Sequence, residues 1–296
     1  MNILITGSTG FVGRHLVPKL AECHQVTELT VSLEDSTALF GNNTQKILVT
    51  GNQEKLVEDI KNANPEIVIH LASFLTSEDD YNTMLKLVDA NVLFLCRLLD
   101  ALKIIELKLF INTGTFAEYF KGDGTLQPAY LYAATKTAAH FFIDYYSNVY
   151  GFNYITIVPY TIYGGRYTKK KVIDIIYESL NSEKTTDLSP GNQILDFIHV
   201  EDVADFYVTV VKEQARIPNK QVFQLGTGKG TSLKELSNII EQQTGKKCNI
   251  NWGAKSYRKT DVMYAVADIA PQFNLLNWEP QIILEEGIKK IINQWQ

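Results

Sequence analysis

Short apolar runs alternate along this chain with longer segments in which apolar residues recur every three or four positions. The apolar runs, each of strand length, lie at 2–6, 26–31, 47–49, 66–73, 107–112 and 154–159. The clearest helical segment, 84–102, repeats leucine, valine and methionine at helical spacing around Asn91. Strands that alternate with helices predict right-handed crossovers and a parallel sheet. We therefore predict an α/β fold with a doubly wound parallel sheet.

The first predicted strand leads directly into a glycine turn with the spacing G-x-x-G-x-x-G. A helical pattern with Leu16 and Leu20 on one face comes after the turn. A glycine turn between a strand and a helix N-terminus lets the backbone approach a pyrophosphate, which the free amides and the helix dipole then hold. We predict that this turn binds a dinucleotide through Gly7, Thr9, Gly10, Phe11, Val12 and Gly13.

The second predicted strand, 26–31, ends without a carboxylate. In dinucleotide-binding folds an acidic residue at this point holds the ribose diol of NAD, and a basic residue accommodates the 2′-phosphate of NADP. Here Ser32 follows the strand directly, and the carboxylates Glu34 and Asp35 lie beyond the position where the ribose-binding residue is expected. The missing carboxylate favours NADP(H) and leaves NAD(H) open, with Ser32 as the expected contact. After the third strand, Asn52 is expected to reach the adenine.

Tyr132 and Lys136 stand at the start of an apolar helical run that continues to 142. Their spacing places the phenol and the ammonium one turn apart on the same helix face. A nearby cation favours a phenolate, so we expect Lys136 to lower the pKa of Tyr132 and make it a general acid or base near neutral pH. A second pair of this spacing, Tyr167 and Lys171, opens a lysine cluster, and we interpret it as surface.

Hydroxyl side chains end the fifth predicted strand. Ligands bind outside the carboxyl ends of parallel strands, so Thr113 and Thr115 are expected to face the ligand. The loop after this strand is long enough to bring Thr115 and Tyr132 to one substrate oxygen, and Thr113 is the competing choice. Further cofactor contacts are expected at the ends of the fourth and sixth strands, at Leu71, Ala72 and Pro159.

Beyond the sixth strand lie a basic cluster, a strand with a histidine and the start of a further helix. Arg166 and Lys169 belong to a basic cluster that is either a solvated face or a contact for a substrate anion. His199 lies in a strand between apolar neighbours and is interpreted as structural. Asp202 is predicted to be the N-cap of the next helix.

The composition excludes several classes of function. The chain has 296 residues, 45% hydrophobic and 21% charged, and a net charge of −5, which argues against a nucleic-acid surface. No apolar stretch approaches the roughly 18 residues that a membrane span needs. Cys23, Cys96 and Cys248 show no close spacing, so neither a metal site nor a disulfide framework is predicted. We expect a cytoplasmic protein without contacts to membrane or nucleic acid.

Nine segments together resemble the extended short-chain dehydrogenase/reductase family, in its branch of nucleotide-sugar epimerases, dehydratases and ketoreductases. They are Gly7–Gly13, His70–Ala72, Asn91, Thr115, Tyr132–Lys136, Tyr163–Gly164, Asp196–Ala204, Arg258–Asp261 and Leu276–Pro280. The resemblance implies a Rossmann-type NAD(P)-binding domain, residues 1–165 plus 195–225, and a smaller α/β C-terminal domain for a nucleotide sugar, residues 166–194 plus 226–296. It also implies a homodimer formed through helices at 81–104 and 132–150.

The same resemblance implies roles for individual residues. Tyr132 would transfer the proton, Lys136 would hold the ribose and lower the pKa of Tyr132, and Thr115 would hydrogen-bond the reacting oxygen. The substrate contacts implied are Phe74, Thr115, Arg166, Lys169 and Arg258.

The choice of reaction depends on the two residues directly after Thr115. The dehydratases of the family carry an Asp-Glu pair there, whereas this chain has Phe116 and Ala117, so dehydration is not expected. The shortened loop before Tyr132 is similar to that of CDP-abequose and CDP-paratose synthases, which reduce C4 of a CDP-4-keto-3,6-dideoxyhexose with NADPH. We expect such a ketoreductase. An NAD-dependent UDP-sugar 4-epimerase and a non-catalytic dinucleotide sensor are the alternatives.

Two departures from the family pattern concern the substrate. Leu195 stands where the family carries an arginine that helps to bind the diphosphate. Val158 and Thr161 stand where the sixth strand of the family carries arginine and asparagine.

Overall fold

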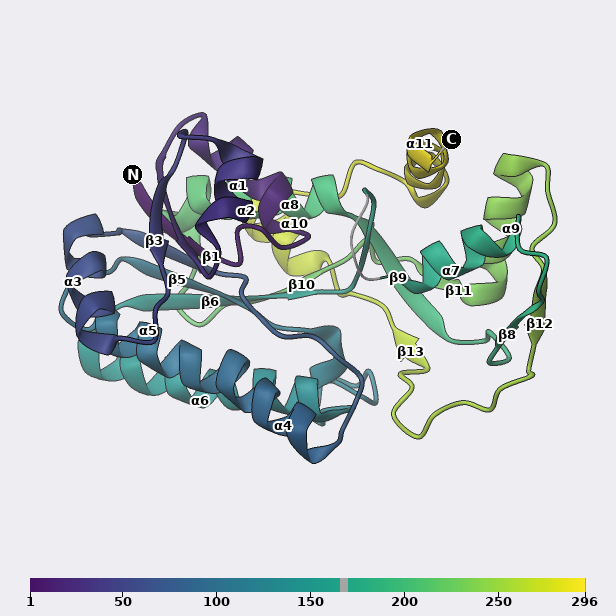
Figure 1. Cartoon of the computed structure of the whole chain (residues 1–296), viewed down its shortest axis with the longest axis horizontal. Helices are drawn as coiled ribbons and strands as arrows, with labels where there is room; N and C mark the ends of the chain where they lie inside the picture. Colours follow the sequence, from purple (N-terminus) through teal and green to yellow (C-terminus); the bar gives the residue numbers. More distant parts are fainter. Residues whose placement is uncertain (166–169, 296) are drawn as a thin grey trace.

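A seven-stranded parallel sheet forms the larger part of the protein, whose computed structural model describes residues 1–165 and 170–295. The strand order is β10-β6-β5-β4-β1-β2-β3 (Figure 1). The strands are β1 (Asn2–Thr6), β2 (Gln25–Thr30), β3 (Gln45–Leu48), β4 (Ile67–His70), β5 (Leu109–Thr113), β6 (Asn153–Pro159) and β10 (Val222–Leu225). The order reverses between β1 and β4, so the ligand crevice of a doubly wound sheet is expected at the carboxyl ends of these two strands. The predicted Rossmann-type α/β fold is confirmed.

Helices cover both faces of this sheet, as Figure 1 shows. One face carries α3 (Gln53–Ala63), α4 (Tyr81–Val88), α5 (Phe94–Leu102) and α6 (Leu131–Tyr150). The other carries α1 (Gly13–Ala21), α2 (Leu33–Phe40), α8 (Val200–Glu213) and α10 (Ala270–Leu276). Each face has its own buried apolar cluster, because the strands are apolar on both sides and every helix turns its apolar stripe to the sheet.

A smaller α/β part lies at the other end of the molecule (Figure 1). Its four-stranded sheet combines β7 (Thr161–Tyr163), β9 (Ile194–His199), β11 (Gly230–Ser232) and β13 (Tyr264–Ala265), and β8 (Thr186–Leu188) pairs with β12 (Ile250–Trp252). The helices α7 (Val172–Ser179), α9 (Leu233–Thr244) and α11 (Leu284–Trp295) complete it. Two of these strands, β7 and β9, come from the range predicted for the Rossmann domain, and the division by residue number stays a prediction.

Two local predictions were wrong. The segment 84–102 is not one regular helix, because a π-helical turn, Asp89–Leu93, separates α4 from α5. The N-cap of α8 is His199, whose Nδ1 accepts from the backbone N–H of Glu201 at 3.2 Å, and not Asp202. Asp202 lies inside the first turn and accepts instead from the N–H groups of Gln281 and Ile282, at 3.1 and 3.0 Å.

Candidate active site

The glycine turn between β1 and α1 has room for backbone and for nothing larger. Gly7 has φ +72°, and a Cβ on it would lie 2.7 Å from the backbone nitrogen of Ala72. A Cβ on Gly13 would lie 2.3 Å from the carbonyl oxygen of Gly7. The turn therefore packs directly on the backbone that leaves β4, and its glycines are required by these close approaches. Such a turn fits a dinucleotide pyrophosphate.

Buried hydrogen bonds tie this turn to the segment after β4. The Thr6 hydroxyl lies 2.9 Å from Nδ1 of His70 and accepts from the N–H of Ala72 at 3.1 Å. Burial lowers the pKa of His70 to about 3, and the nearby Lys136 ammonium acts in the same direction. His70 is therefore a neutral structural ring at physiological pH.

Asn91, in the π-helical turn, fixes the next part of the same segment. Its side-chain oxygen accepts from the N–H of Phe74 at 2.7 Å, and its nitrogen donates to the Phe74 carbonyl at 3.1 Å and to the Thr135 hydroxyl at 3.0 Å. Thr135 in turn donates to the Tyr132 carbonyl at 2.7 Å. Asn91 thereby holds the loop after β4 against the helix that carries Tyr132. A π-turn at such a position is typical of functional sites.

Tyr132 and Lys136 lie in the first two turns of α6 and are buried, with 7% and 2% of their surfaces exposed. The Tyr132 hydroxyl hydrogen-bonds the side chain of Ser73, in the loop after β4. The Lys136 ammonium makes no hydrogen bond to any residue of the described ranges. A buried cation without a partner fits a cofactor hydroxyl group.

The structure corrects the expected pKa of Tyr132. Burial raises the pKa of this phenol well above its usual value, and the hydrogen bond from Ser73 only partly opposes the rise. Burial also lowers the pKa of Lys136 to about 8, against the opposing attraction of the Glu118 carboxylate. The predicted lowering of the Tyr132 pKa followed from the charge of Lys136 alone, whereas removal from water disfavours the charged form of both side chains.

Thr115 is held at the start of a short 3₁₀ turn, Phe116–Glu118, and is 8% exposed. Its N–H donates to Oε1 of Glu118 at 2.8 Å. The other oxygen of Glu118, Oε2, lies 2.8 Å from Nε2 of His140 and accepts from the Thr137 hydroxyl at 3.2 Å, and both of these residues are on α6. The fully buried Glu118 thus fixes Thr115 to the helix of Tyr132.

No role was predicted for Glu118 from the sequence. The spacing Thr-x-x-Glu at 115–118 is that of a capping box, which would have identified the pair. Thr113, the competing hydroxyl, lies 2.7 Å from the hydroxyl of Tyr207 on α8 and is engaged there.

A cavity of about 410 Å³ opens along the glycine turn and the segment after β4. Four predicted contact residues line it: Gly7, Thr9, Ala72 and Phe74. Ser73 lines it as well, so the hydroxyl of Tyr132 bonds directly to its wall. No sequence signal indicated Ser73, because its contact with Tyr132 joins residues far apart in the chain.

The other predicted cofactor residues, apart from Tyr132 and Lys136, do not line this cavity. They are Gly10, Phe11, Val12 and Gly13 in the turn, Ser32 and Asn52 at the N-caps of α2 and α3, Leu71 after β4, Thr113 at the end of β5, and Pro159 at the end of β6. Ser32 accepts from the N–H of Asp35 at 3.1 Å, and Asn52 accepts from the N–H of Lys55 at 3.0 Å.

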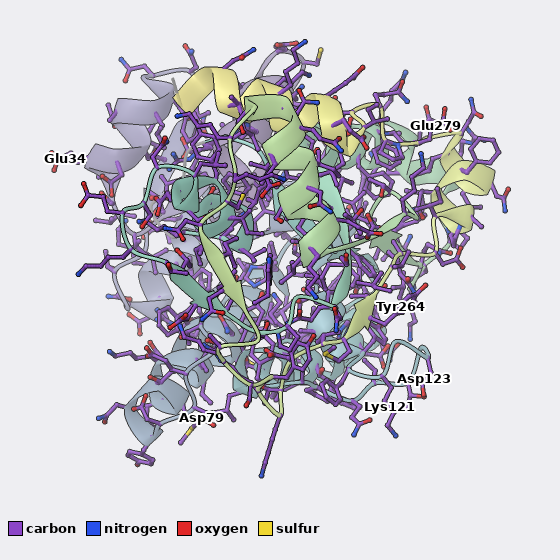
Figure 2. The ribbon with its side chains drawn as sticks, turned by 90° about the vertical axis from the view of Figure 1, so that its right-hand side faces the viewer. Glu34, Asp79, Lys121, Asp123, Tyr264 and Glu279 are labelled. Carbon is purple, nitrogen blue, oxygen red and sulfur yellow. The ribbon has the colours of Figure 1, made fainter. Side chains whose placement is uncertain are left out.

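On the substrate side, Arg258 reaches from the smaller part of the protein to the loop after β4. Its Nη1 donates to the Ser77 hydroxyl at 3.3 Å. The two parts approach each other a second time at Gly122, in the loop between β5 and α6, where a Cβ would lie 3.1 Å from the carbonyl oxygen of Tyr264 on β13; Figure 2 labels Tyr264 and the neighbours of Gly122, Lys121 and Asp123. Leu195 packs against the apolar cluster of the smaller part.

Three residues discussed above, Arg166, Tyr167 and Lys169, lie outside the described residues. Lys171 is described, and its Nζ lies 3.5 Å from the centroid of the Phe11 ring and donates to the Ile162 carbonyl at 2.7 Å. The interpretation of Lys171 as a solvated surface residue was wrong, since most of its side chain is covered.

Comparison with known proteins agrees with this geometry. Residues 3–226 match the model of the NAD dependent epimerase/dehydratase family. The chain belongs to this family. CDP-abequose synthase of Salmonella typhimurium is 27% identical over 99% of this chain and 97% of that enzyme. UDP-glucose 4-epimerase of Mycolicibacterium smegmatis is also 27% identical, again over 99% and 97%.

Solved structures show the same fold. UDP-glucose 4-epimerase of Thermotoga maritima, with UDP-glucose, superposes with a TM-score of 0.87 at 24% identity over 100% of this chain and 98% of the other. UDP-glucuronic acid 4-epimerase of Bacillus cereus, a variant with NAD and a fluorinated substrate analogue, gives 0.88 at 21% identity over 100% of both chains. The family assignment makes this chain an NAD-dependent enzyme of the nucleotide-sugar epimerase and reductase type.

Within residues 1–165 and 170–295, no three His, Cys, Asp or Glu side chains are placed to hold a metal ion together. None of the helices in that part of the chain has the length and apolar character needed to pass through a bilayer.

Proposed function

We propose that this protein is an NAD(P)H-dependent ketoreductase that acts at C4 of a nucleoside diphosphate 4-keto-deoxyhexose, as CDP-abequose and CDP-paratose synthases do. The observation that carries the proposal is the position of the buried Tyr132. Its hydroxyl hydrogen-bonds Ser73, which lines the cavity, and it lies one helical turn from the buried ammonium of Lys136. The full-length similarity to CDP-abequose synthase supports the choice of reaction. The carboxylate-free end of β2 supports NADP(H), with NAD(H) open.

Thr115, Tyr132 and Lys136 each have a defined role in this reaction. The reduced dinucleotide supplies the electron pair when it is bound. Tyr132 donates its proton to the carbonyl oxygen, and the Thr115 hydroxyl donates a hydrogen bond to the same oxygen. Because burial keeps the Tyr132 phenol protonated before the reaction, it starts in the form that a proton donor needs. Lys136 binds the ribose and stabilises the phenolate that remains.

The rival functions use the same site differently. A UDP-sugar 4-epimerase needs the same three side chains, and the M. smegmatis and T. maritima relatives support this alternative. A dinucleotide sensor would need neither a buried Tyr132 nor Thr115 fixed to its helix. A dehydratase would need an acid and a base directly after Thr115, where Phe116 and Ala117 stand.

Replacing the phenol tests the catalytic assignment. Tyr132→Phe is expected to reduce kcat by about 10²- to 10⁴-fold, because the proton donor is lost, and to change the Kd of NADPH by less than about twofold. Turnover with a CDP-4-keto-3,6-dideoxyhexose and fluorescence titration of NADPH measure the two effects. Tyr130→Phe, whose ring stacks on Tyr132 at 6.0 Å, is the matched control and should retain turnover. Undiminished activity of Tyr132→Phe would refute the assignment.

Whether the purified protein consumes NADPH or retains bound NAD distinguishes a reductase from an epimerase. A reductase consumes NADPH stoichiometrically with its 4-keto sugar nucleotide and releases the oxidised dinucleotide. An epimerase retains NAD tightly and interconverts UDP-sugars without net consumption. A panel of CDP- and UDP-sugars assayed with NADH and NADPH therefore distinguishes the two functions, and inactivity across the panel despite cofactor binding would favour the sensor.

Further parts of the proposal concern the setting of the site. We propose that the nucleotide sugar binds between Phe74, which lines the cavity, and Arg258, which contacts Ser77 in the same loop after β4. Arg166 and Lys169 are further candidates for contacts to this substrate. The smaller part of the protein, predicted at 166–194 plus 226–296, would bind the nucleotide. The protein is proposed to act in the cytoplasm as a homodimer.

A further inference from the structure

Arg97, on α5, has a buried donor without an acceptor. Its Nε donates to Oε1 of Gln53 at 3.1 Å, and Nε2 of Gln53 donates back to the Arg97 carbonyl at 2.9 Å. The terminal nitrogen Nη2 is buried and has no hydrogen-bond partner among the described residues, and no carboxylate of the described ranges pairs with the guanidinium. An unsatisfied buried donor costs free energy, and an acceptor on a ligand would remove that cost.

Arg97 lines the same cavity as the glycine turn. Five large apolar side chains line the cavity with it, Leu29, Val31, Val49, Leu93 and Phe94, and Thr30 and Asp89 are polar residues of the same lining. They come from the end of β2 and the residue after it, from the residues after β3, from the π-helical turn and from α5. Apolar walls with one directional donor suit a flat heterocycle that carries a ring acceptor.

The position along the groove identifies which heterocycle belongs there. A dinucleotide that lies along the glycine turn has its adenosine ribose at the carboxyl end of β2. The adenine then lies beyond the ribose, on the side of β3 and α5, where Val49 and Arg97 line the cavity. A 2′-phosphate would instead lie beside Ser32, at the solvent-facing start of α2.

We propose that Arg97 recognises the adenine base, with Nη2 as donor to a ring nitrogen. The inference rests on the proposed dinucleotide-binding function and adds the residue that selects the base. Gln53 orients the guanidinium before the ligand arrives, because it bonds both the side chain and the backbone of Arg97. The recognition is the same for NAD and NADP, since it does not involve the 2′-position.

Binding of ADP and of 2′,5′-ADP, measured by titration calorimetry, tests the proposal. Arg97→Met keeps the length of the side chain and removes the donors, and is expected to weaken both ligands by the same factor, about 10- to 100-fold. Arg216→Met is the control, because Arg216 is exposed and pairs with Glu213 at 3.2 Å, and it should bind both ligands as the unmodified protein does. Loss confined to 2′,5′-ADP would show that Arg97 reads the phosphate and overturn the proposal.

A second variant separates misfolding from loss of the donor. Gln53→Leu leaves Nη2 in place and removes its anchor, so it should weaken both ligands in the same ratio and by less than Arg97→Met. If both variants bind ADP normally, this inference is refuted while the proposed function stands. If the unmodified protein binds neither ligand, the dinucleotide site itself is refuted.

Discussion

At the scale of single residues, burial rather than charge determines the proton affinities of the site. Tyr132 and Lys136 are almost inaccessible, and removal from water favours the neutral form of each. The free protein therefore presents a protonated phenol beside an ammonium that is easily deprotonated. A bound dinucleotide, with its ribose hydroxyls and phosphates, would give this ammonium the partner that the described residues do not provide.

The pKa of Lys136, lowered to about 8, predicts how activity depends on pH. Below pH 8 the ammonium is charged, and above pH 8 it loses its proton, so kcat/KM for the dinucleotide should be constant up to about pH 8 and fall above it. This parameter reports groups of the free enzyme. Lys136→Arg keeps its charge throughout the range and should remove the alkaline fall, even at lower turnover. A fall of the same shape in Lys136→Arg would contradict the assignment.

At the scale of elements, the start of α8 shows how one strand-to-helix junction connects the two parts of the protein. His199 ends β9 and caps α8, while the Asp202 carboxylate holds the backbone at Gln281 and Ile282, which leads into α11. Burial lowers the pKa of His199 to about 4, and Lys290 acts in the same direction. The neutral ring can accept the N–H of Glu201, which a protonated ring cannot do.

This cap predicts a loss of stability in acid. Because the pKa of His199 is lower in the folded state than its unfolded value of about 6.5, the unfolded chain binds more protons between pH 4 and 6.5, and stability falls as pH drops through this window. His199→Asn keeps a capping acceptor that does not titrate, so its unfolding free energy should fall less steeply, by up to about 1.4 kcal/mol per pH unit. Urea unfolding at several pH values measures both slopes. The neighbouring residues Glu201, His15 and Lys290 are present in both proteins, so they do not account for a difference between the slopes. Equal slopes would refute the prediction.

At the scale of the whole molecule, the outer face of α4 and α6 carries large apolar side chains that the described part of the chain leaves uncovered. Phe141 is 74% exposed, Tyr145 58% and Tyr81 69%. The two helices contact each other and run side by side along the lower edge of Figure 1. An apolar patch of this kind typically marks a protein–protein interface, which supports the proposed homodimer.

Charge introduced on this face should prevent dimerisation. Phe141→Glu with Tyr145→Glu places two carboxylates in the proposed interface, and the mass measured by light scattering should fall from that of a dimer to that of a monomer. Phe273→Glu, on α10 and 51% exposed in the unmodified protein, is the control and should leave the mass unchanged. A dimer that persists in the double variant would exclude this face as the interface.

Local sequence patterns were enough to predict the parallel sheet, the glycine turn and the same-face spacing of Tyr132 and Lys136. Each of these depends on local spacing: apolar runs of strand length, glycines at fixed intervals, and two side chains one helical turn apart. The spacing Thr-x-x-Glu at 115–118 is also local, and it would have predicted the capping contact between Thr115 and Glu118 that the structure shows.

Which groups are removed from water and which distant residues meet depends on how the elements pack together. The raised pKa of Tyr132, its bond to Ser73, the clamp of Asn91 on the loop after β4, and the buried Nη2 donor of Arg97 all arise where separate elements pack together. Local spacing carries no information on such contacts, because burial is a property of the whole packed chain. That is why the direction predicted from charge alone for the pKa of Tyr132 was wrong.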